Sequence, residues 1–397
     1  MKNKFVYTPG PTYVRENVRL ERAVTTTNPD VDVEFVEFYK NTCDKIASIL
    51  HTKNPLYILS GEGILGLEAA CASLTEPGDR VLVIDNGIFG RGFKDFVEIY
   101  GGQAVLFESS YTNTVNIEKL KTFLEKDHNF KYATIVHCDT PTGVMNDISK
   151  ICPLLNEYGI LSVVDSVAGM VGEEVKVDEW KIDIILGGSQ KAFSAPPGLT
   201  IVALSENAQK AIDNRKLPVT GFYCNLNIWK TYYEDKWFPY TMPISDIMCL
   251  DTAINNILDE GSKNVVLRHN TTATAVRKAI TEFGLQLFLE SGYSNNVTAV
   301  KIPKSIGALN LKSHMESKYN TLVTTTLNPY ENELLRIGHM GENSHYDRTI
   351  FVLSVLDKAI KDLGFESDKN LVVLFNKYYL SQTYKNNTAQ GNQSHTS

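Results

Sequence analysis

The sequence predicts an α/β fold built on a mainly parallel, seven-stranded sheet that helices cover on both faces. Seven short apolar runs alternate with helical stretches between residues 56 and 213. The runs are almost continuously apolar, which is typical of strands buried on both faces. Their alternation with helices indicates crossover connections, and therefore mainly parallel pairing.

The elements of this large sheet can be placed in order along the chain. The expected strands are 56–59, 81–84, 104–107, 132–137, 161–164, 182–186 and 199–204. The expected helices are 35–50, 65–73, 92–100, 117–125, 147–157 and 206–213. Ligands of such sheets bind beyond the carboxyl ends of the strands, so we expect the functional site there.

The chain divides into four expected parts. They are an N-terminal arm (1–20), a large domain (21–255), a smaller C-terminal α+β domain (256–380) and a polar tail (381–397). The tail is poor in apolar residues, so we expect it to be disordered. The elements expected near and within the small domain are a long helical pattern at 244–283, strands at 297–302, 322–325 and 334–337, and a closing helix at 350–363.

Composition and charge exclude several classes of function. With 43% hydrophobic and 21% charged residues, the chain can bury a large core, and its net charge of −7 argues against nucleic-acid or membrane partners. No two of its cysteines have metal-ligand spacing, so we expect reduced thiols and no metal site. The N-terminus lacks the apolar run of a signal peptide, so we expect a cytoplasmic location.

The most informative segment is 187–199, where Lys191 stands among small residues directly after an apolar run. Small neighbours leave room for an aldehyde, and the end of a strand holds the side chain rigidly. Partial desolvation lowers the pKa of the amine, which can then act as a nucleophile near neutral pH. This setting indicates a lysine that forms an imine. The alternative is a solvated lysine in a Gly/Pro-rich loop.

Three further segments follow strands at the same expected edge of the sheet. A glycine-rich turn with Glu62, Gly63 and Ile64 opens a helix, and its backbone N–H groups favour an anion. Phe89 lies between glycines, which favours a stacking surface in a pocket over core packing. Thr140 could hydrogen-bond a ring hydroxyl or could serve only in the turn.

Two charged residues stand in otherwise apolar strands, where a bare charge is unfavourable. Asp165 follows the strand at 161–164, and a protonated pyridine nitrogen would be a suitable cationic partner; helix capping is the alternative. Arg336 stands in a strand of the small domain, and its planar guanidinium suits a carboxylate. A structural salt bridge is the alternative for Arg336.

Together these segments resemble the class V aminotransferases, which are pyridoxal 5′-phosphate enzymes of fold type I. Within that class they are most similar to the alanine/serine–glyoxylate (or pyruvate) aminotransferases. The resemblance runs from Thr8 to about Gly364. It implies a homodimer with shared active sites that moves an amino group from an amino acid to a small 2-oxo acid.

The resemblance implies two catalytic residues, Lys191 and Asp165, and one substrate-binding residue, Arg336. Lys191 would form the internal aldimine with the cofactor and then carry the proton of the substrate α-carbon, as base and then as acid. Asp165 would pair with the pyridine nitrogen and keep it protonated. Arg336 would bind the substrate carboxylate.

The resemblance also implies how the cofactor is held. Phe89 would stack on one face of the ring and Val167 would pack on the other, while Thr140 would contact the ring hydroxyl. Gln190 would bind the phosphate. Thr241 would bind it as well, reaching across the homodimer interface to the neighbouring active site.

Glu62 departs from the family pattern, which has a small residue there, often serine, to help bind phosphate. A carboxylate about 4 Å from a phosphate costs on the order of 4 kcal/mol per charge pair at an effective dielectric of about 20. Phe238 also replaces a frequent phosphate-binding tyrosine. Both features are similar to pyridoxamine–pyruvate aminotransferase, which acts on unphosphorylated pyridoxamine. Against this alternative, Gln190 keeps the phosphate-ligand pattern, and Leu327 stands where that enzyme has a second substrate arginine.

Three other classes of protein share this fold and are alternatives to a transaminase. A lyase or aldolase could use Lys191 and Asp165 in the same way, but it would release product without an oxo acid. A cysteine desulfurase needs a nucleophilic cysteine late in the chain, and no cysteine follows Cys249. A regulator that binds the cofactor would normally carry a DNA-binding domain. We therefore expect a transaminase.

Overall fold

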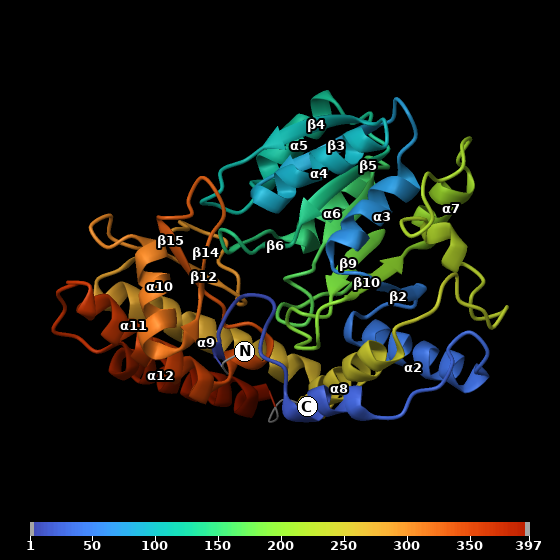
Figure 1. Ribbon diagram of the computed structural model, residues 1–397. Helices are drawn as coiled ribbons and strands as arrows, with labels where there is room; N and C mark the ends of the chain where they lie inside the picture. Colours follow the sequence, from blue (N-terminus) through green and yellow to red (C-terminus); the bar gives the residue numbers. More distant parts are fainter. Residues whose placement is uncertain (1–3, 394–397) are drawn as a thin grey trace.

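The computed structural model describes residues 4–393, and the side chains from Lys4 to Tyr384. Its centre is a seven-stranded sheet made of the strands that the sequence predicts (Figure 1). The strands are β2 (Leu56–Ser60), β3 (Arg80–Asp85), β4 (Gln103–Glu108), β5 (Tyr132–Val136), β8 (Leu161–Asp165), β9 (Ile184–Gly188) and β10 (Leu199–Leu204). Their order across the sheet is β2-β10-β9-β8-β5-β3-β4.

The pairing confirms a mainly parallel sheet. β10 runs antiparallel to both of its neighbours, β2 and β9, and every other pair in the sheet is parallel. The carboxyl ends of β2, β3, β5, β8 and β9 consequently share one edge of the sheet. The loops that follow these five strands contain most of the predicted site residues.

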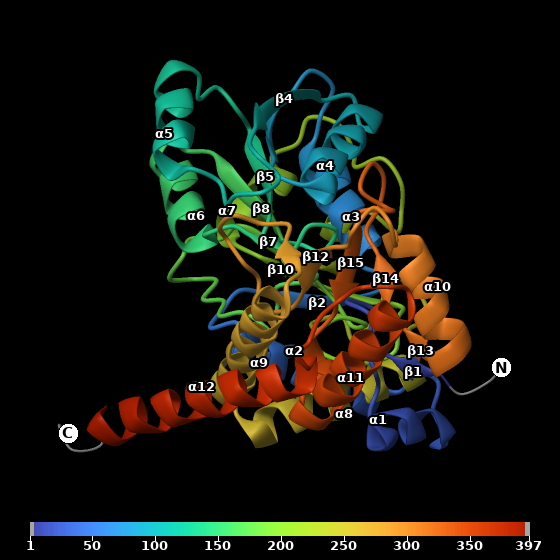
Figure 2. The same cartoon turned by 90° about the vertical axis from the view of Figure 1, so that its left-hand side faces the viewer.

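Helices cover both faces of the sheet, as the continuous apolar strands require. They are α2 (Val33–Ile49), α3 (Ile64–Leu74), α4 (Ile88–Ile99), α5 (Ile117–Lys126), α6 (Ile148–Glu157) and α7 (Glu206–Asp213). Figure 2 shows α5 and α6 on one side of the strands and α3 and α4 on the other. Local sequence fixes some helix starts, since the side chains of Asn116 and Ser205 accept hydrogen bonds from Lys119 N–H and Ala208 N–H.

The long helical pattern at 244–283 forms two helices instead of one. α8 (Ile244–Glu260) and α9 (Ser262–Phe283) meet at Gly261, whose φ is +86°. This left-handed conformation is accessible to glycine and interrupts the helix. Gly261 is the signal for this break in the sequence, because a glycine in a helical pattern is a possible stop signal.

The small domain is an antiparallel sheet in the order β11-β12-β15-β14, packed against helices. Its elements are β11 (Gln286–Leu287), β12 (Thr298–Lys301), α10 (Ala308–Tyr319), β14 (Thr324–Thr325), β15 (Leu334–Ile337) and α11 (Tyr346–Asp362). The strand expected at 322–325 is split, because β13 (Thr321–Leu322) leaves this sheet and pairs in parallel with β1 (Phe5–Val6). The N-terminal arm is thereby attached to the small domain.

The tail that we expect to be disordered begins as a helix in the structure. α12 (Leu371–Gln393) follows α11, so residues 381–393 are helical, while 394–397 lie outside the described residues. Leu371 and Phe375 are buried at its start. Extending a helix costs less than nucleating one, so the polar sequence continues the anchored first turns. The domain boundaries at residues 20, 255 and 380 stay predictions. Within the described part of the chain, no helix has both the length and the apolar character that crossing a membrane needs.

Candidate active site

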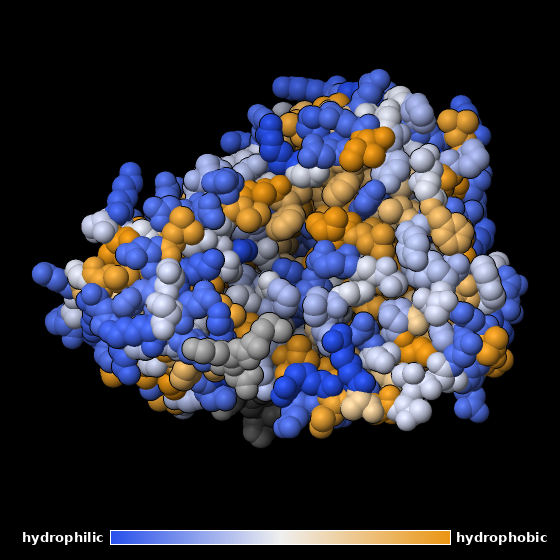
Figure 3. Space-filling model, viewed as in Figure 1, coloured by the Kyte–Doolittle hydropathy of each residue, from blue (hydrophilic) through white to orange (hydrophobic). Residues whose placement is uncertain are grey.

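A cavity of about 280 Å³ lies at the shared edge where the parallel strands end. Its lining contains eight of the predicted site residues, brought together from five different loops. The lining residues are Glu62, Gly63, Ile64, Leu67, Phe89, Cys138, Thr140, Asp165, Val167, Ala168 and Lys191. Figure 3 shows the molecular surface hollowed between the two domains in this region. Gln190, Thr241 and Arg336 are the predicted residues that do not line the cavity.

Lys191 extends from the turn that follows β9. Its Nζ donates a hydrogen bond to the carbonyl oxygen of Pro9 at 3.0 Å. Burial, together with the nearby positive charge of Arg336, lowers the pKa of the amine. The lysine is therefore largely withdrawn from water, in contrast to the solvated lysine of the alternative interpretation.

Asp165 is the last residue of β8 and is 6% exposed. Among the described residues, its carboxylate accepts a single hydrogen bond, from Val167 N–H at 2.9 Å. Burial raises its pKa to about 6, and the positive charge of Lys191 opposes this rise. A buried carboxylate with so few donors has capacity for a cationic partner in the cavity.

Phe89 stands in the first turn of α4, where a buried carboxylate fixes the backbone. Phe89 N–H donates to Asp139 Oδ2 at 2.9 Å, and Asp139 is fully buried, which raises its pKa to about 7. A Cβ on Gly87 would lie 2.2 Å from the same oxygen, so glycine permits this close approach. Asp139 is not among the residues that the sequence predicts for the site. The signal that could have found Asp139 is an acidic residue two positions after the apolar run that ends at His137.

In the glycine-rich turn before α3, the carboxylate of Glu62 accepts the hydrogen bonds that a bound anion could accept. Glu62 Oε2 accepts a hydrogen bond from Ile64 N–H at 3.0 Å, and Glu62 Oε1 accepts one from Gln190 Nε2. The Glu62 carboxylate thus occupies donors at the turn where we expect an anion to bind. The amide of Gln190, expected as a phosphate ligand, faces this carboxylate.

Arg336 lies on β15, and its guanidinium donates to backbone carbonyls. Nε donates to Thr325 O at 2.9 Å, and Nη1 donates to Thr140 O at 3.3 Å. None of the ion pairs among the described residues includes Arg336, so the structural salt bridge of the alternative is not seen. Burial lowers the pKa of Arg336 to about 10, although Asp139 opposes this change. The Thr140 contact places the guanidinium beside the cavity, where it can receive a substrate carboxylate.

Thr241 lies apart from the cavity of its own chain. It is exposed, and its hydroxyl donates to Asp30 Oδ2 at 2.9 Å. Phe238 is 2% exposed and packs edge-on against Phe35 and Tyr39 in the core. The contact of Thr241 with a neighbouring active site stays a prediction.

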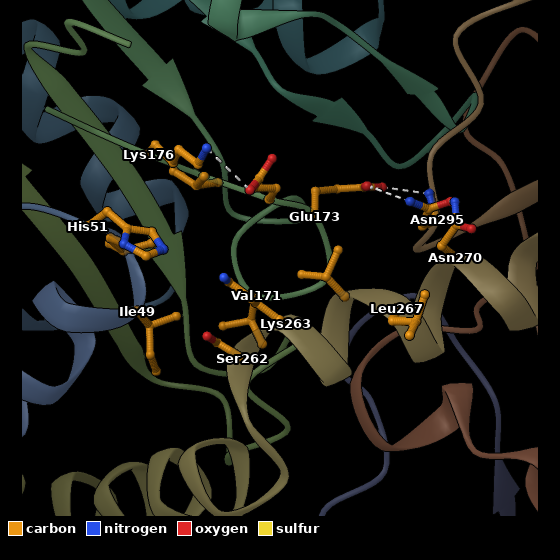
Figure 4. Close-up of a pocket in the computed structure, with 14 residues that line it drawn as sticks. Ile49, His51, Val171, Glu173, Lys176, Ser262, Lys263, Leu267, Asn270 and Asn295 are labelled. Carbon is orange, nitrogen blue, oxygen red and sulfur yellow. Dashed lines mark hydrogen bonds and ion pairs between the residues drawn. The ribbon is translucent and has the colours of Figure 1, made fainter. Parts of the chain in front are cut away.

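A second cavity, of about 480 Å³, contains none of the predicted site residues (Figure 4). It lies between the loop after β8 and the first turns of α9. Glu173 lines it and points toward Asn295, accepting hydrogen bonds from Asn295 N–H at 2.5 Å and Asn295 Nδ2 at 2.8 Å. Burial raises the pKa of Glu173 to about 7. Glu173 thus links the large domain to the segment that leads into β12.

Comparisons with known proteins define the class. The family model for class V aminotransferases matches residues 13–318. The L-aspartate–glyoxylate aminotransferase of Paracoccus denitrificans is 31% identical over 287 residues, covering 71% of this chain and 72% of that protein. The pyridoxamine–pyruvate transaminase of Mesorhizobium japonicum is 33% identical over 263 residues, covering 66% and 67%. The crystal structure of ureidoglycine–glyoxylate aminotransferase from Bacillus subtilis superposes with a TM-score of 0.92 at 27% identity, covering 96% and 98%.

The chain therefore belongs to the class V aminotransferases. It is an enzyme that transfers amino groups, its fold is fold type I, and its cofactor is pyridoxal 5′-phosphate. The ring end of the cavity fits this cofactor, because Asp165 offers a carboxylate with few donors and Lys191 a desolvated amine. At the phosphate end, Gln190 and Ile64 N–H are suitable donors, but Glu62 accepts hydrogen bonds from both.

Proposed function

We propose that this enzyme transfers an amino group from an α-amino acid to a small 2-oxo acid, pyruvate or glyoxylate, in the cavity around Lys191. The observation that supports it best is the grouping of the desolvated amine of Lys191, the Asp165 carboxylate with few donors and the half-buried guanidinium of Arg336, which forms no ion pair with any described residue. The glyoxylate and pyruvate specificities of its relatives agree with this proposal.

Each of the three groups has a distinct task. Arg336 binds the substrate carboxylate with its planar guanidinium and thereby orients the α-carbon. The bound cofactor supplies the carbonyl that takes up the amino group and the ring that accepts the electrons released with the α-proton. The Asp165 carboxylate holds the proton on the ring nitrogen by accepting its hydrogen bond.

Lys191 moves the proton of the substrate. Its Nζ takes the proton from the α-carbon as a base and later donates it as an acid. A lowered pKa serves the first step, because the amine must be uncharged to accept a proton. Phe89 and Val167 line the same cavity and would contact the two faces of the ring. Thr140 would contact its hydroxyl.

A half-reaction assay tests this proposal. Enzyme loaded with pyridoxal 5′-phosphate is mixed with single amino acids, without an oxo acid, and the keto product is counted per active site. A transaminase stops after about one equivalent and resumes when pyruvate or glyoxylate is added. Continuous turnover without an oxo acid would indicate the lyase alternative and contradict the proposal. Serine, alanine and aspartate are the first donors to test.

A second candidate function follows from Glu62. Its carboxylate occupies the two donors that a phosphate would use, which favours an unphosphorylated ligand such as pyridoxamine. A relative named pyridoxamine–pyruvate transaminase shares 33% identity with this chain. Binding of pyridoxal 5′-phosphate and of free pyridoxal to the apoprotein separates the two candidates. Tight binding of the phosphate ester supports the first function, and tight binding of only the free aldehyde supports the second.

We also propose that the active form is a homodimer in the cytoplasm. Exposed Phe222, Tyr223 and Trp237 lie near Thr241 in the sequence, and large exposed aromatic side chains are common at protein interfaces. All six cysteines are free, which agrees with a reducing compartment. Sedimentation equilibrium tests the dimer. Mixed dimers that combine a Thr241→Ala chain with a Lys191→Ala chain test whether Thr241 serves the neighbouring site.

A further inference from the structure

We propose that residues 7–12 of the N-terminal arm position the catalytic lysine: the Pro9 carbonyl holds the free amine of Lys191, and the arm links that amine to the small domain. This inference rests on the proposed role of Lys191 as the carrier of the α-proton. It adds a positioning element that the predicted site residues do not include.

The first observation is the direct contact between the arm and the lysine side chain. Pro9 O accepts the hydrogen bond of Lys191 Nζ at 3.0 Å. At Gly10, an added Cβ would lie 2.5 Å from Nζ and 2.5 Å from Cδ of Lys191. The φ of Gly10 is +115°, a conformation that other residues rarely adopt. Gly10 thus leaves just enough room for the lysine to pass along the arm.

The second observation is that the arm is fastened to the backbone around the lysine. Thr12 N–H donates to Gln190 O at 3.0 Å, and the Thr12 hydroxyl donates to Lys191 O at 3.0 Å. The same hydroxyl lies 3.1 Å from Ser194 Oγ. These contacts fasten the arm at Thr12, shortly after Pro9, to the main chain that carries Lys191.

The third observation is that the arm also lies against the small domain. β1 pairs with β13, and Asn343 Nδ2 donates to Thr8 O at 3.3 Å. At Gly338, which follows β15, an added Cβ would lie 2.3 Å from Pro9 N. β15 contains Arg336, so the strand that binds the substrate carboxylate ends against the residue that holds the lysine amine. A shift of β15 on carboxylate binding would press on Pro9.

The carbonyl oxygen of Pro9 suits the transfer of the α-proton to Lys191. A carbonyl oxygen has no proton to give, so it can hold one N–H of the uncharged amine while the nitrogen lone pair stays free to face the substrate. The C–H bond at the α-carbon then breaks, its electron pair would be taken up by the ring that the bound cofactor supplies, and the proton forms a new N–H bond at Nζ. Misplacing the amine by about 1 Å lowers such a rate on the order of 100-fold.

The test compares two glycine variants with positive φ. Gly10→Ala places a methyl group against Lys191, while Gly78→Ala, at φ +89°, has no atom within 4 Å of the added carbon. Single-turnover rates are measured with amino acids carrying protium or deuterium at the α-carbon. We expect Gly10→Ala to slow α-proton transfer at least about tenfold with a full isotope effect, and Gly78→Ala to match the wild type.

A second pair covers the case in which Gly10→Ala does not fold. Thr12→Val removes the hydrogen bonds to Lys191 O and Ser194, whereas Thr12→Ser keeps them. We expect Thr12→Val to slow α-proton transfer severalfold and Thr12→Ser to restore it. Wild-type transfer rates in both Gly10→Ala and Thr12→Val would overturn the positioning role. Borohydride labelling away from Lys191 in the wild type would instead overturn the proposed function.

Discussion

Two carboxylates of the same cavity, Asp165 and Glu62, are held in opposite ways. Asp165 is buried at the end of β8 and accepts one hydrogen bond, from Val167 N–H. Glu62 is exposed on the turn before α3, and each of its oxygens accepts a hydrogen bond, from Gln190 and from Ile64 N–H. The Asp165 carboxylate can therefore accept further hydrogen bonds, whereas the Glu62 carboxylate already accepts one at each oxygen.

This difference indicates that a ligand would supply a missing partner at Asp165 and not at Glu62. A buried group without a full set of partners is destabilising by about 1–3 kcal/mol, so a cationic ring nitrogen at Asp165 brings a clear gain. A phosphate gains less, because it must first displace Glu62 from the same donors. Under the proposed function, the Asp165 end therefore favours binding of the ring, and Glu62 limits how much the phosphate adds.

The largest expected effect on the rate of the half-reaction comes from replacing Lys191. Lys191→Ala removes the base that moves the α-proton, and we expect the half-reaction to slow by up to about 10⁴-fold. Lys210→Ala changes an exposed lysine paired with Glu206 and should leave the rate unchanged. Stopped-flow measurement of keto-acid formation checks both. A Lys191→Ala rate within tenfold of the wild type would remove the lysine from the mechanism.

Asp165→Asn keeps the shape of the side chain but removes its charge. The amide can still accept from Val167 N–H, so we expect a folded protein. Without an anion beside it, the ring nitrogen is harder to keep protonated, and we expect a loss of about 10²–10³-fold in the half-reaction rate. The change is measured at saturating amino donor. Unchanged rates would show that no ring nitrogen lies at Asp165.

Arg336→Lys tests the carboxylate end of the site. A lysine keeps the positive charge but lacks the planar pair of donors, and a hydrogen bond to a charged group contributes about 1.5–3 kcal/mol. We expect KM to rise about tenfold to 100-fold for the amino acid and the oxo acid alike, with little change in cofactor affinity. Steady-state kinetics with both substrates supplies the check. A rise for only one substrate would argue against a shared carboxylate site.

Glu62→Ser tests the phosphate end directly. It removes the carboxylate that accepts from Gln190 and Ile64 N–H, so both donors become free for phosphate. We expect affinity for pyridoxal 5′-phosphate to rise at least about tenfold, with affinity for free pyridoxal unchanged. Equilibrium titration of the apoproteins measures both, and Glu62→Gln separates the charge from the size. Equal changes for the two ligands would refute the contrast between the two ends.

The smallest expected effect is a pH dependence that originates at Asp165. Its pKa is raised to about 6 in the free protein, and a cationic partner would lower it. Binding then requires the carboxyl group to lose its proton below pH 6. The contribution of Asp165 to cofactor affinity therefore falls at most about tenfold per pH unit as the pH drops below 6 and is constant above it. Asp165→Asn should lack this dependence. Affinity that rises toward acidic pH would contradict it.

The sequence predicts the strands and the residues at their ends for a physical reason. Apolar runs predict buried strands. Charged residues at the ends of such runs, such as Asp165 and Lys191, are easily recognised because the residues before them are apolar. Contacts between distant segments leave no such local pattern. The Glu62–Gln190 hydrogen bond and the Pro9–Lys191 contact therefore appear only in the folded chain. The helical start of the tail depends in the same way on the anchoring of α12.

Borohydride reduction followed by peptide mapping tests the central claim most directly. The enzyme is incubated with pyridoxal 5′-phosphate and, in parallel, with pyridoxal; it is then reduced, digested and sequenced by mass spectrometry. We expect every pyridoxyl label to lie on Lys191, whichever of the two compounds binds. A stoichiometric label on any other lysine, with Lys191 unmodified, would contradict it.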